Sequence, residues 1–354
     1  MKTILVKDLQ EGSIFSEDIY VDDDNLFVPK GATIREKDIK RLISLDIESV
    51  QTEGNIVANS AGYPPHRTYL ELIEQLGEIC EKIEANLTVK AGTINGIAER
   101  LQQAVSEQRQ SFVSFILGGE VNGHILAKGL INSAILSALI AIEMKLENDK
   151  ILNMIIGALL HDVGMLRIPR EIVEKRGGLS PKELQRIQSH TLYTYKIVNG
   201  ELGYPEDVGA IALQHHERWD GEGYPMRLSG QTIDLEARIV SVADAFEAMV
   251  SKKPYRNSMI GYQAMKNLLS DNLRRFDPDV TKAFIQIMGI YPIGSIVLLS
   301  NGAMARVEEV QTTAPLRPKI RILENDGELT DLLVEKSLFI TKAVDPKEIA
   351  GKYE

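Results

Sequence analysis

The placement of histidine is the feature that most constrains how this chain of 354 residues can fold. Four of its six histidines, His161, His190, His215 and His216, lie in one stretch whose apolar residues recur with the helical period. A lone histidine on an apolar helix is more often a core residue with a hydrogen-bond partner than a ligand. Four such residues close together indicate that several helices bring their imidazoles to one site.

Two aspartates accompany these histidines. His161-Asp162 ends an apolar helical run, Ile151 to Leu160, and Val163-Gly164 follows it, which suits a helix terminus. Asp244 lies in a second apolar run, residues 237–250. An unpaired carboxylate in such surroundings is costly to bury, so a cation is its natural partner.

Imidazole and carboxylate groups with no thiolate nearby indicate a catalytic site for Fe, Mn or Zn rather than a structural zinc site. Two metals are the economical arrangement, because a pair can hold a bridging hydroxide for attack on phosphorus and neutralise the phosphate charge. We therefore expect two divalent ions, with Fe or Mn preferred and Zn as the alternative. The candidate ligands are His161, Asp162, His190, His215, His216 and Asp244.

Composition limits the kinds of partner that the protein can bind and the cellular compartment expected for it. A formal charge of −10 and a pI near 5.3 argue against binding of DNA or RNA polymers. The single cysteine, Cys80, is compatible with a reducing cytosol, and no secretion signal precedes Lys7, so we expect a cytoplasmic protein. The apolar segment Leu130 to Ile142 is shorter than the roughly 20 residues needed to cross a bilayer, which predicts a buried core helix and no membrane span.

The rest of the chain predicts a mainly α protein with small mixed or β-rich ends. Short β-favouring runs and a helical stretch at Arg35 to Leu45 predict a small α+β domain, and Asn59 to Pro65 breaks regular structure. Helical signals then continue to about residue 290, including capping residues at Ser180-Pro181 and Asp277-Pro278. The expected domains are 1–58 (small α+β, regulatory), 66–118 (connecting helices), 119–290 (all-helical core) and 291–354 (β-rich appendage).

The order and spacing of these motifs resemble the HD-GYP family over roughly residues 120 to 290. The resemblance is carried by His161-Asp162, His190, Ala243-Asp244 and the block His215-His216-Glu217-Arg218-Trp219-Asp220-Gly221-Glu222-Gly223-Tyr224-Pro225. It implies an all-helical HD-type core. It also implies hydrolysis of the bacterial second messenger cyclic di-GMP to linear pGpG, GMP or both.

The same resemblance implies roles for individual residues. The six candidate ligands would hold the metals, with Asp162 as the bridge between them. Asp162 and Lys253 would be the catalytic residues, and Lys253 would contact a phosphate. The implied substrate-binding residues are Gly223, Tyr224, Pro225, Arg238, Lys253 and Arg256, although a solvated charge explains each basic residue as well.

Two departures from the family pattern bear on activity. Gly129 stands where the family carries a further histidine ligand, and His124, five residues earlier, does not share its helical face as closely as a residue three or four away would. Met165 stands where the family has a lysine after the His-Asp pair. Methionine can neither donate a proton nor carry charge. A three-metal site is therefore less expected than a two-metal site.

Three functions stay open at this point. The first is a phosphodiesterase acting on cyclic di-GMP, with activity intact or reduced. The second is a weakly active or inactive module that senses cyclic dinucleotide or metal, or binds a protein, which Gly129 and Met165 favour. The third is a phosphohydrolase for another nucleotide, against which the Gly223-Tyr224-Pro225 loop argues. A homodimer or a signalling-protein partner is compatible with each of them.

Overall fold

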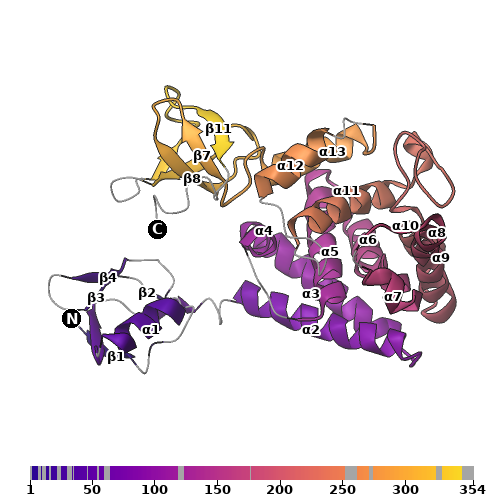
Figure 1. The fold of residues 1–354 in the computed structure, drawn as a ribbon, viewed down its shortest axis with the longest axis horizontal. Helices are drawn as coiled ribbons and strands as arrows, with labels where there is room; N and C mark the ends of the chain where they lie inside the picture. The colour runs from indigo at the N-terminus through magenta and orange to yellow at the C-terminus, as the bar shows by residue number, and fades with distance from the viewer. Residues whose placement is uncertain are drawn as a thin grey trace. The chain divides into compact units, whose positions relative to one another are not determined.

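The chain divides into two compact units, Met1–Glu71 and Leu72–Glu354, in the computed structural model (Figure 1). The structure describes residues 2–344 apart from 7–8, 10–12, 16, 22–24, 30–33, 35, 46, 54–55, 60–63, 119–122, 176, 252–260, 271–273 and 324–328.

The first unit is a small α+β domain. Four short antiparallel strands form one sheet in the order β1-β5-β3-β4, and two further strands, β2 and β6, pair separately. Its elements are β1 (Lys2–Leu5), β2 (Ser13–Phe15), β3 (Ile19–Tyr20), β4 (Leu26–Val28), α1 (Glu36–Ser44), β5 (Ser49–Thr52) and β6 (Ile56–Asn59). Alternate residues of the sheet and one face of α1 enclose a core that includes Phe15, Ile19, Leu42 and Val50.

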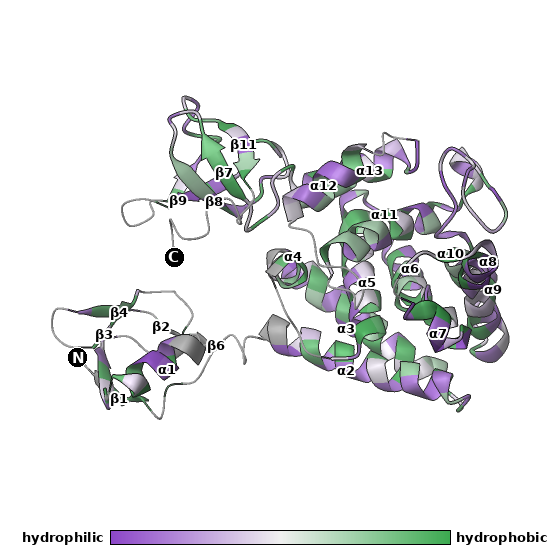
Figure 2. Cartoon of the chain, viewed as in Figure 1, coloured by the Kyte–Doolittle hydropathy of each residue, from purple (hydrophilic) through white to green (hydrophobic). Residues whose placement is uncertain are grey.

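The second unit begins with α-helical layers that hold most of the buried apolar residues. Its first helices are most of α2 (Pro64–Glu84), which begins before the boundary at Leu72, then α3 (Ala91–Glu107), α4 (Arg109–Gly118), α5 (Ile125–Glu143) and α6 (Asn148–Leu160). Figure 2 shows hydrophobic and hydrophilic residues alternating along α2, as an amphipathic helix requires. The side chains of Leu72, Leu76 and Ile83 on this helix are buried.

Helix α5 is the central element of the helical core and packs against α6 and α11. It is long and apolar enough to cross a membrane by length and composition, but 72% of its most apolar window is buried inside the protein. Residues all around the helix are buried, including Ile131, Ile135 and Leu139. This is the arrangement of an interior helix, as its sequence predicts.

The remaining helices of the second unit are mostly short. They are η2 (Val163–Arg167), α7 (Arg170–Val173), α8 (Pro181–Gln188), α9 (His190–Tyr195), η3 (Lys196–Glu201), α10 (Glu206–Gln214), η4 (Gly230–Thr232), α11 (Leu235–Val250), α12 (Gly261–Ser270) and α13 (Pro278–Met288). Both predicted capping signals are confirmed. Ser180 and Glu183 form a capping box on α8, and the Asp277 side chain accepts a hydrogen bond from the backbone of Asp279 on α13.

The chain continues into a five-stranded antiparallel sheet with the order β10-β9-β8-β7-β11. Its strands are β7 (Ile296–Leu299), β8 (Met304–Glu309), β9 (Lys319–Ile322), β10 (Leu329–Asp331) and β11 (Ile340–Val344). Val297, Val307 and Ile320 lie in its buried core. The predicted fold class, a mainly α core with a small α+β domain before it and a β-rich segment after it, is confirmed.

Candidate metal centre

The structure brings all six predicted ligands to one place. The C-cap of α6 is His161, and α9 begins at His190. The C-cap of α10 is His215, and Asp244 lies on α11. Two groups of ligand atoms form, each within 4.8 Å, and Asp162 belongs to both. The groups are Asp162, His190, His215 and His216, and His161, Asp162 and Asp244.

Three of the histidines are oriented by the helix that carries them. The Nδ1 atoms of His161 and His190 lie 2.7 Å, and that of His215 lies 2.8 Å, from the backbone carbonyl oxygen three residues earlier. Donation from Nδ1–H to a carbonyl leaves the lone pair on Nε2 for a metal. The Nε2 atoms of His190 and His215 lie 3.0 and 3.5 Å from Oδ1 of Asp162, so both face the shared carboxylate.

The atoms at the centre lack hydrogen-bond partners. Asp162 Oδ1, His190 Nε2 and His215 Nε2 are buried, and none makes a hydrogen bond within the described part of the chain. Buried polar atoms are normally satisfied, so three unsatisfied atoms that face one another require an explanation. Divalent cations at this point would satisfy all three, and imidazole with carboxylate is a donor set that Fe, Mn and Zn accept. The residues present therefore fit a metal site.

Protonation at the centre follows from the two carboxylates. Burial opposes ionisation of Asp162, but His190 and His161 hold its pKa well below the usual range. Burial likewise opposes protonation of His161, but the neighbouring carboxylates raise its pKa to about 9. The pKa of Asp244 falls to about 2, because His161 outweighs the effect of burial. Burial lowers the pKa of His216 well below its usual value and keeps that imidazole neutral. Both carboxylates are therefore ionised near neutral pH, and a metal ion that binds here would displace the proton of His161.

A close backbone approach explains the glycine after the His-Asp pair. A Cβ atom on Gly164 would lie 2.2 Å from the His190 carbonyl oxygen and 2.5 Å from Thr194 Oγ1. The Gly164 backbone N–H donates to Thr194 Oγ1 at 2.9 Å. No other residue fits at this crossing of η2 and α9. The contact holds His190 close to Asp162.

The loop that carries Gly223, Tyr224 and Pro225, here called the signature loop, covers one side of the centre. The Tyr224 ring stacks on His216 with centroids 4.8 Å apart and an angle of 29° between the planes. A Cβ atom on Gly223 would lie 2.4 Å from the backbone nitrogen of Arg218, so the loop folds back closely on itself here. The Tyr224-Pro225 peptide bond is cis. The prediction that these three residues contact substrate stays a prediction.

Glu217 fixes this loop, a role that its place in the motif did not reveal. Its buried carboxylate accepts hydrogen bonds from the backbone N–H of Met226 at 2.6 Å and of Leu228 at 2.9 Å. These two residues flank Arg227, which has a φ of 57°. A left-handed conformation costs a residue other than glycine about 1–2 kcal/mol. Two hydrogen bonds to a carboxylate, each worth about 1.5–3 kcal/mol, offset that cost.

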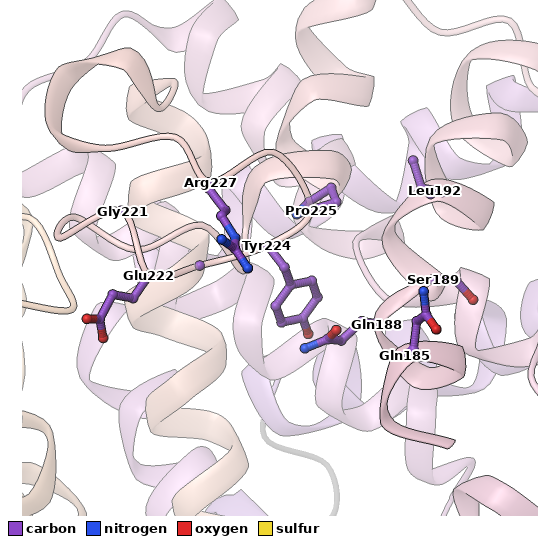
Figure 3. Close-up of a pocket in the computed structure, with 10 residues that line it drawn as sticks. Gln185, Gln188, Ser189, Leu192, Gly221, Glu222, Tyr224, Pro225 and Arg227 are labelled. Carbon is purple, nitrogen blue, oxygen red and sulfur yellow. The ribbon is translucent and has the colours of Figure 1, made fainter. Parts of the chain in front are cut away.

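The loop and α8 enclose a cavity of about 650 Å³ beside the metal centre (Figure 3). Tyr224 and Arg227 line it from the loop, and Gln185 and Gln188 line it from α8. Helical periodicity places Gln185 and Gln188 on one face of α8. Neither glutamine was predicted as a site residue, because a solvent-facing side chain carries no such signal in one sequence.

Glu247 of α11 lies beside Gly129, the position where the family carries a further histidine. A Cβ atom on Gly129 would lie 3.5 Å from Oε1 of Glu247, a buried residue of α11 that also accepts hydrogen bonds from Asn132 and Ser251. The alternative ligand, His124, is instead the N-cap of α5, where its Nδ1 accepts from the backbone of Ala127. His124 belongs to neither group of ligand atoms among the described residues.

The predicted basic residues differ in how they are placed. Arg238 pairs with Asp277, donates to the carbonyl of Ile233 and lies 5.6 Å from the centroid of the Trp219 ring. These contacts tie α11 to the start of α13. A substrate contact by Arg238 stays a prediction. Lys253 and Arg256 lie outside the described residues, so their predicted roles stay predictions as well.

Comparison with known proteins agrees with this geometry. A model of the HD domain family matches residues 93–280, and a model of a KOW domain associated with the HD domain matches residues 296–352. Cyclic di-GMP phosphodiesterase PdeB of Borreliella burgdorferi is 26% identical over 324 residues, which cover 91% of this chain and 85% of PdeB. A cyclic di-GMP phosphodiesterase of Thermotoga maritima is 38% identical over 153 residues, which cover 43% of this chain and 42% of that protein.

A solved structure supports the fold over most of the chain. Bd1817, an HDG"Y"P protein from Bdellovibrio bacteriovorus, superposes with a TM-score of 0.55 at 18% identity and covers 81% of this chain and 98% of its own. The resemblance that the motifs predict is confirmed. The chain belongs to the HD domain family and is similar to HD-GYP-like phosphodiesterases, among them the cyclic di-GMP phosphodiesterases of B. burgdorferi and T. maritima.

Proposed function

We propose that this chain is a metal-dependent phosphodiesterase that hydrolyses cyclic di-GMP to linear pGpG, GMP or both. The observation that carries the proposal is the shared position of Asp162, which belongs to both groups of ligand atoms. Its Oδ1 atom and two imidazole Nε2 atoms are buried and lack hydrogen bonds within the described residues. This arrangement suits two cations that share one carboxylate.

The chain's own residues supply orientation and charge. Divalent ions held by the six ligands would provide an activated water and neutralise charge on the phosphate. Asp162 and Asp244 hold the negative charge that retains cations, and the helix carbonyls fix the imidazoles before any ligand binds. The Tyr224 ring covers His216 and limits solvent on that side.

Similarity to cyclic di-GMP phosphodiesterases supports cyclic di-GMP as the substrate. The relative PdeB, a cyclic di-GMP phosphodiesterase, aligns with 91% of the chain, so the likeness is not confined to the ligand motifs. A 3'3'-cGAMP-specific phosphodiesterase of Vibrio cholerae is 36% identical over 128 residues, which cover 36% of this chain. Both nucleotides contain guanine and a cyclic phosphodiester.

The second candidate is a module that binds cyclic dinucleotide or metal with little or no turnover. Two residues support it. Gly129 cannot coordinate a third metal as the family's histidine does, and Met165 cannot supply the cation that the family's lysine supplies. Glu247 lies beside Gly129, where the family's histidine would stand. Binding of cyclic di-GMP without product formation would identify this function.

The test is product formation from cyclic di-GMP, followed by chromatography, in the wild type and two aspartate variants. Asp162→Asn removes the shared negative charge and should lower turnover by at least about a hundredfold. Asp207→Asn, at an exposed residue of α10, is the matched control and should leave turnover unchanged. Equal turnover in Asp162→Asn and the wild type would overturn the proposal.

A further inference from the structure

We infer that the cavity between α8 and the signature loop is a binding site for guanine. The inference deepens the proposed function, and rests on it for the identity of the substrate whose base enters the cavity. The cavity of about 650 Å³ lies within the range of roughly 300–1,000 Å³ common for small-molecule sites. Figure 3 shows its loop wall with Tyr224 and Arg227 and its helix wall with Gln185 and Gln188.

The cavity adjoins the metal centre through two residues. Tyr224 lines it, stacks on the ligand His216, and lies 6.4 Å from the ring of His190 between centroids. Ser189, another lining residue, immediately precedes His190. The cavity therefore lies beside the metal centre, with Tyr224 and Ser189 between the two.

The helix wall offers hydrogen bonds of the kind that guanine requires. Gln185 and Gln188 lie three residues apart on α8, so their carboxamides extend from the same face. Neither side chain makes a hydrogen bond with another residue that the structure describes. Each carboxamide provides an acceptor oxygen and two donor hydrogens. They can accept from the ring and amino N–H groups of guanine and donate to its oxygen.

The loop wall offers a cation directed at the cavity. Arginine recognises guanine through paired hydrogen bonds to O6 and N7, an edge that adenine does not share because it carries an amino group in place of O6. Arg227 makes no ion pair with another described residue. Its left-handed backbone is held on both sides, since Glu217 accepts from the N–H groups of Met226 and Leu228. A strained residue held in this way is a feature of binding sites.

The acidic residue of the cavity does not neutralise this cation. Glu222 lines the rim, but its carboxylate lies 3.8 Å from the guanidinium of Arg218. In Figure 3 its side chain points away from Tyr224. Arg227 is the only cationic side chain among the described residues that line the cavity. A planar base with acceptors on one edge and donors on another complements these two walls.

The test measures binding of 5'-GMP and 5'-AMP to the metal-loaded full chain by calorimetry. Mononucleotides lack the cyclic diester, so the readout does not depend on phosphodiesterase turnover. The wild type should bind GMP more tightly than AMP. Arg227→Asn keeps a residue that tolerates the left-handed backbone, and Gln188→Ala changes the opposite wall. Each variant should weaken GMP binding about tenfold and leave AMP binding nearly unchanged.

Lys182→Asn, at an exposed residue of α8 that does not line the cavity, is the matched control and should bind both nucleotides as the wild type does. Equal losses for GMP and AMP in Arg227→Asn would overturn the inference, because they indicate a contact with phosphate alone. Unchanged GMP binding in both cavity variants would overturn it as well. Guanine-selective binding without hydrolysis of cyclic di-GMP would support the site and contradict the proposed phosphodiesterase function.

Discussion

Replacing Gly164 with alanine should separate α9 from the residues that follow α6 and disrupt the metal centre. The new Cβ atom would lie 2.2 Å from the His190 carbonyl oxygen, 2.5 Å from Thr194 Oγ1 and 2.6 Å from the Thr194 backbone nitrogen. Two of these three atoms, the His190 oxygen and the Thr194 nitrogen, belong to the backbone and cannot move without moving α9. Non-bonded contacts of carbon are normally about 3.5 Å, so α9 has to move by roughly 1 Å.

The magnitude follows from overpacking and one lost hydrogen bond. Overpacking in a rigid interior costs about 1–3 kcal/mol. Loss of the bond from the Gly164 N–H to Thr194 Oγ1 adds about 0.5–1.5 kcal/mol. The free energy of unfolding should fall by about 2–4 kcal/mol. His190 moves with α9, so its distance of 3.0 Å from Asp162 changes and metal binding weakens.

Thermal unfolding and metal content per chain measure these two effects in the same preparation. Gly200→Ala is the matched control, because a Cβ atom on Gly200 in η3 would meet nothing within 4 Å. The control should keep the metal content and the Tm of the wild type. Wild-type stability and metal content in Gly164→Ala would refute the view that this close approach holds the two ligands together.

Four further predictions concern the helical core, the loop that follows α10 and the metal centre. Gly129→Ala should raise the free energy of unfolding by up to about 1 kcal/mol, because alanine favours helix and its Cβ would lie 3.5 Å from Glu247, an ordinary contact. Gly157→Ala should lower the free energy of unfolding by about 1–3 kcal/mol, because its Cβ would lie 2.6 Å from Ile211 Cδ1. Urea unfolding measures both variants, and changes of the same sign would contradict this reasoning. Glu217→Ala removes the acceptor for two loop N–H groups, so hydrogen exchange in residues 221–230 should accelerate while α5 stays protected. Unchanged exchange in the loop would contradict the role of Glu217 in fixing it. Removal of bound metal by a chelator should lower the Tm, since a ligand at a hundred times its Kd stabilises the folded state by about 2.7 kcal/mol, and a Tm that does not respond would argue against a metal site.

Local sequence signals predicted the helical parts of the fold well. The capping box of Ser180 and Glu183 begins α8 as expected, and the apolar run before His161 ends as α6 ends. Such signals act over a few residues, so one sequence displays them fully. The grouping of the six candidate ligands also agrees with the sequence, because imidazoles and carboxylates are costly to bury together without a cation.

Contacts between segments far apart in the sequence were harder to predict. Strand β11 pairs with β7 at one edge of the sheet, although β8, β9 and β10 separate the two in sequence, and no local pattern specifies that partner. Helical periodicity shows which face of α11 is buried, but it does not reveal that Glu247 lies beside Gly129 on α5. Arg238 is near Asp244 in sequence, yet it pairs with Asp277. These outcomes depend on how helices cross, which spacing alone does not determine.

The measurement that tests the central claim most directly is metal content by mass spectrometry on protein purified without oxygen, followed by hydrolysis of cyclic di-GMP in the same sample. The shared position of Asp162 predicts about two metal ions per chain, together with turnover. Metal and nucleotide binding without turnover would contradict the phosphodiesterase and favour the sensing module. A chain that retains no metal would contradict the metal centre itself.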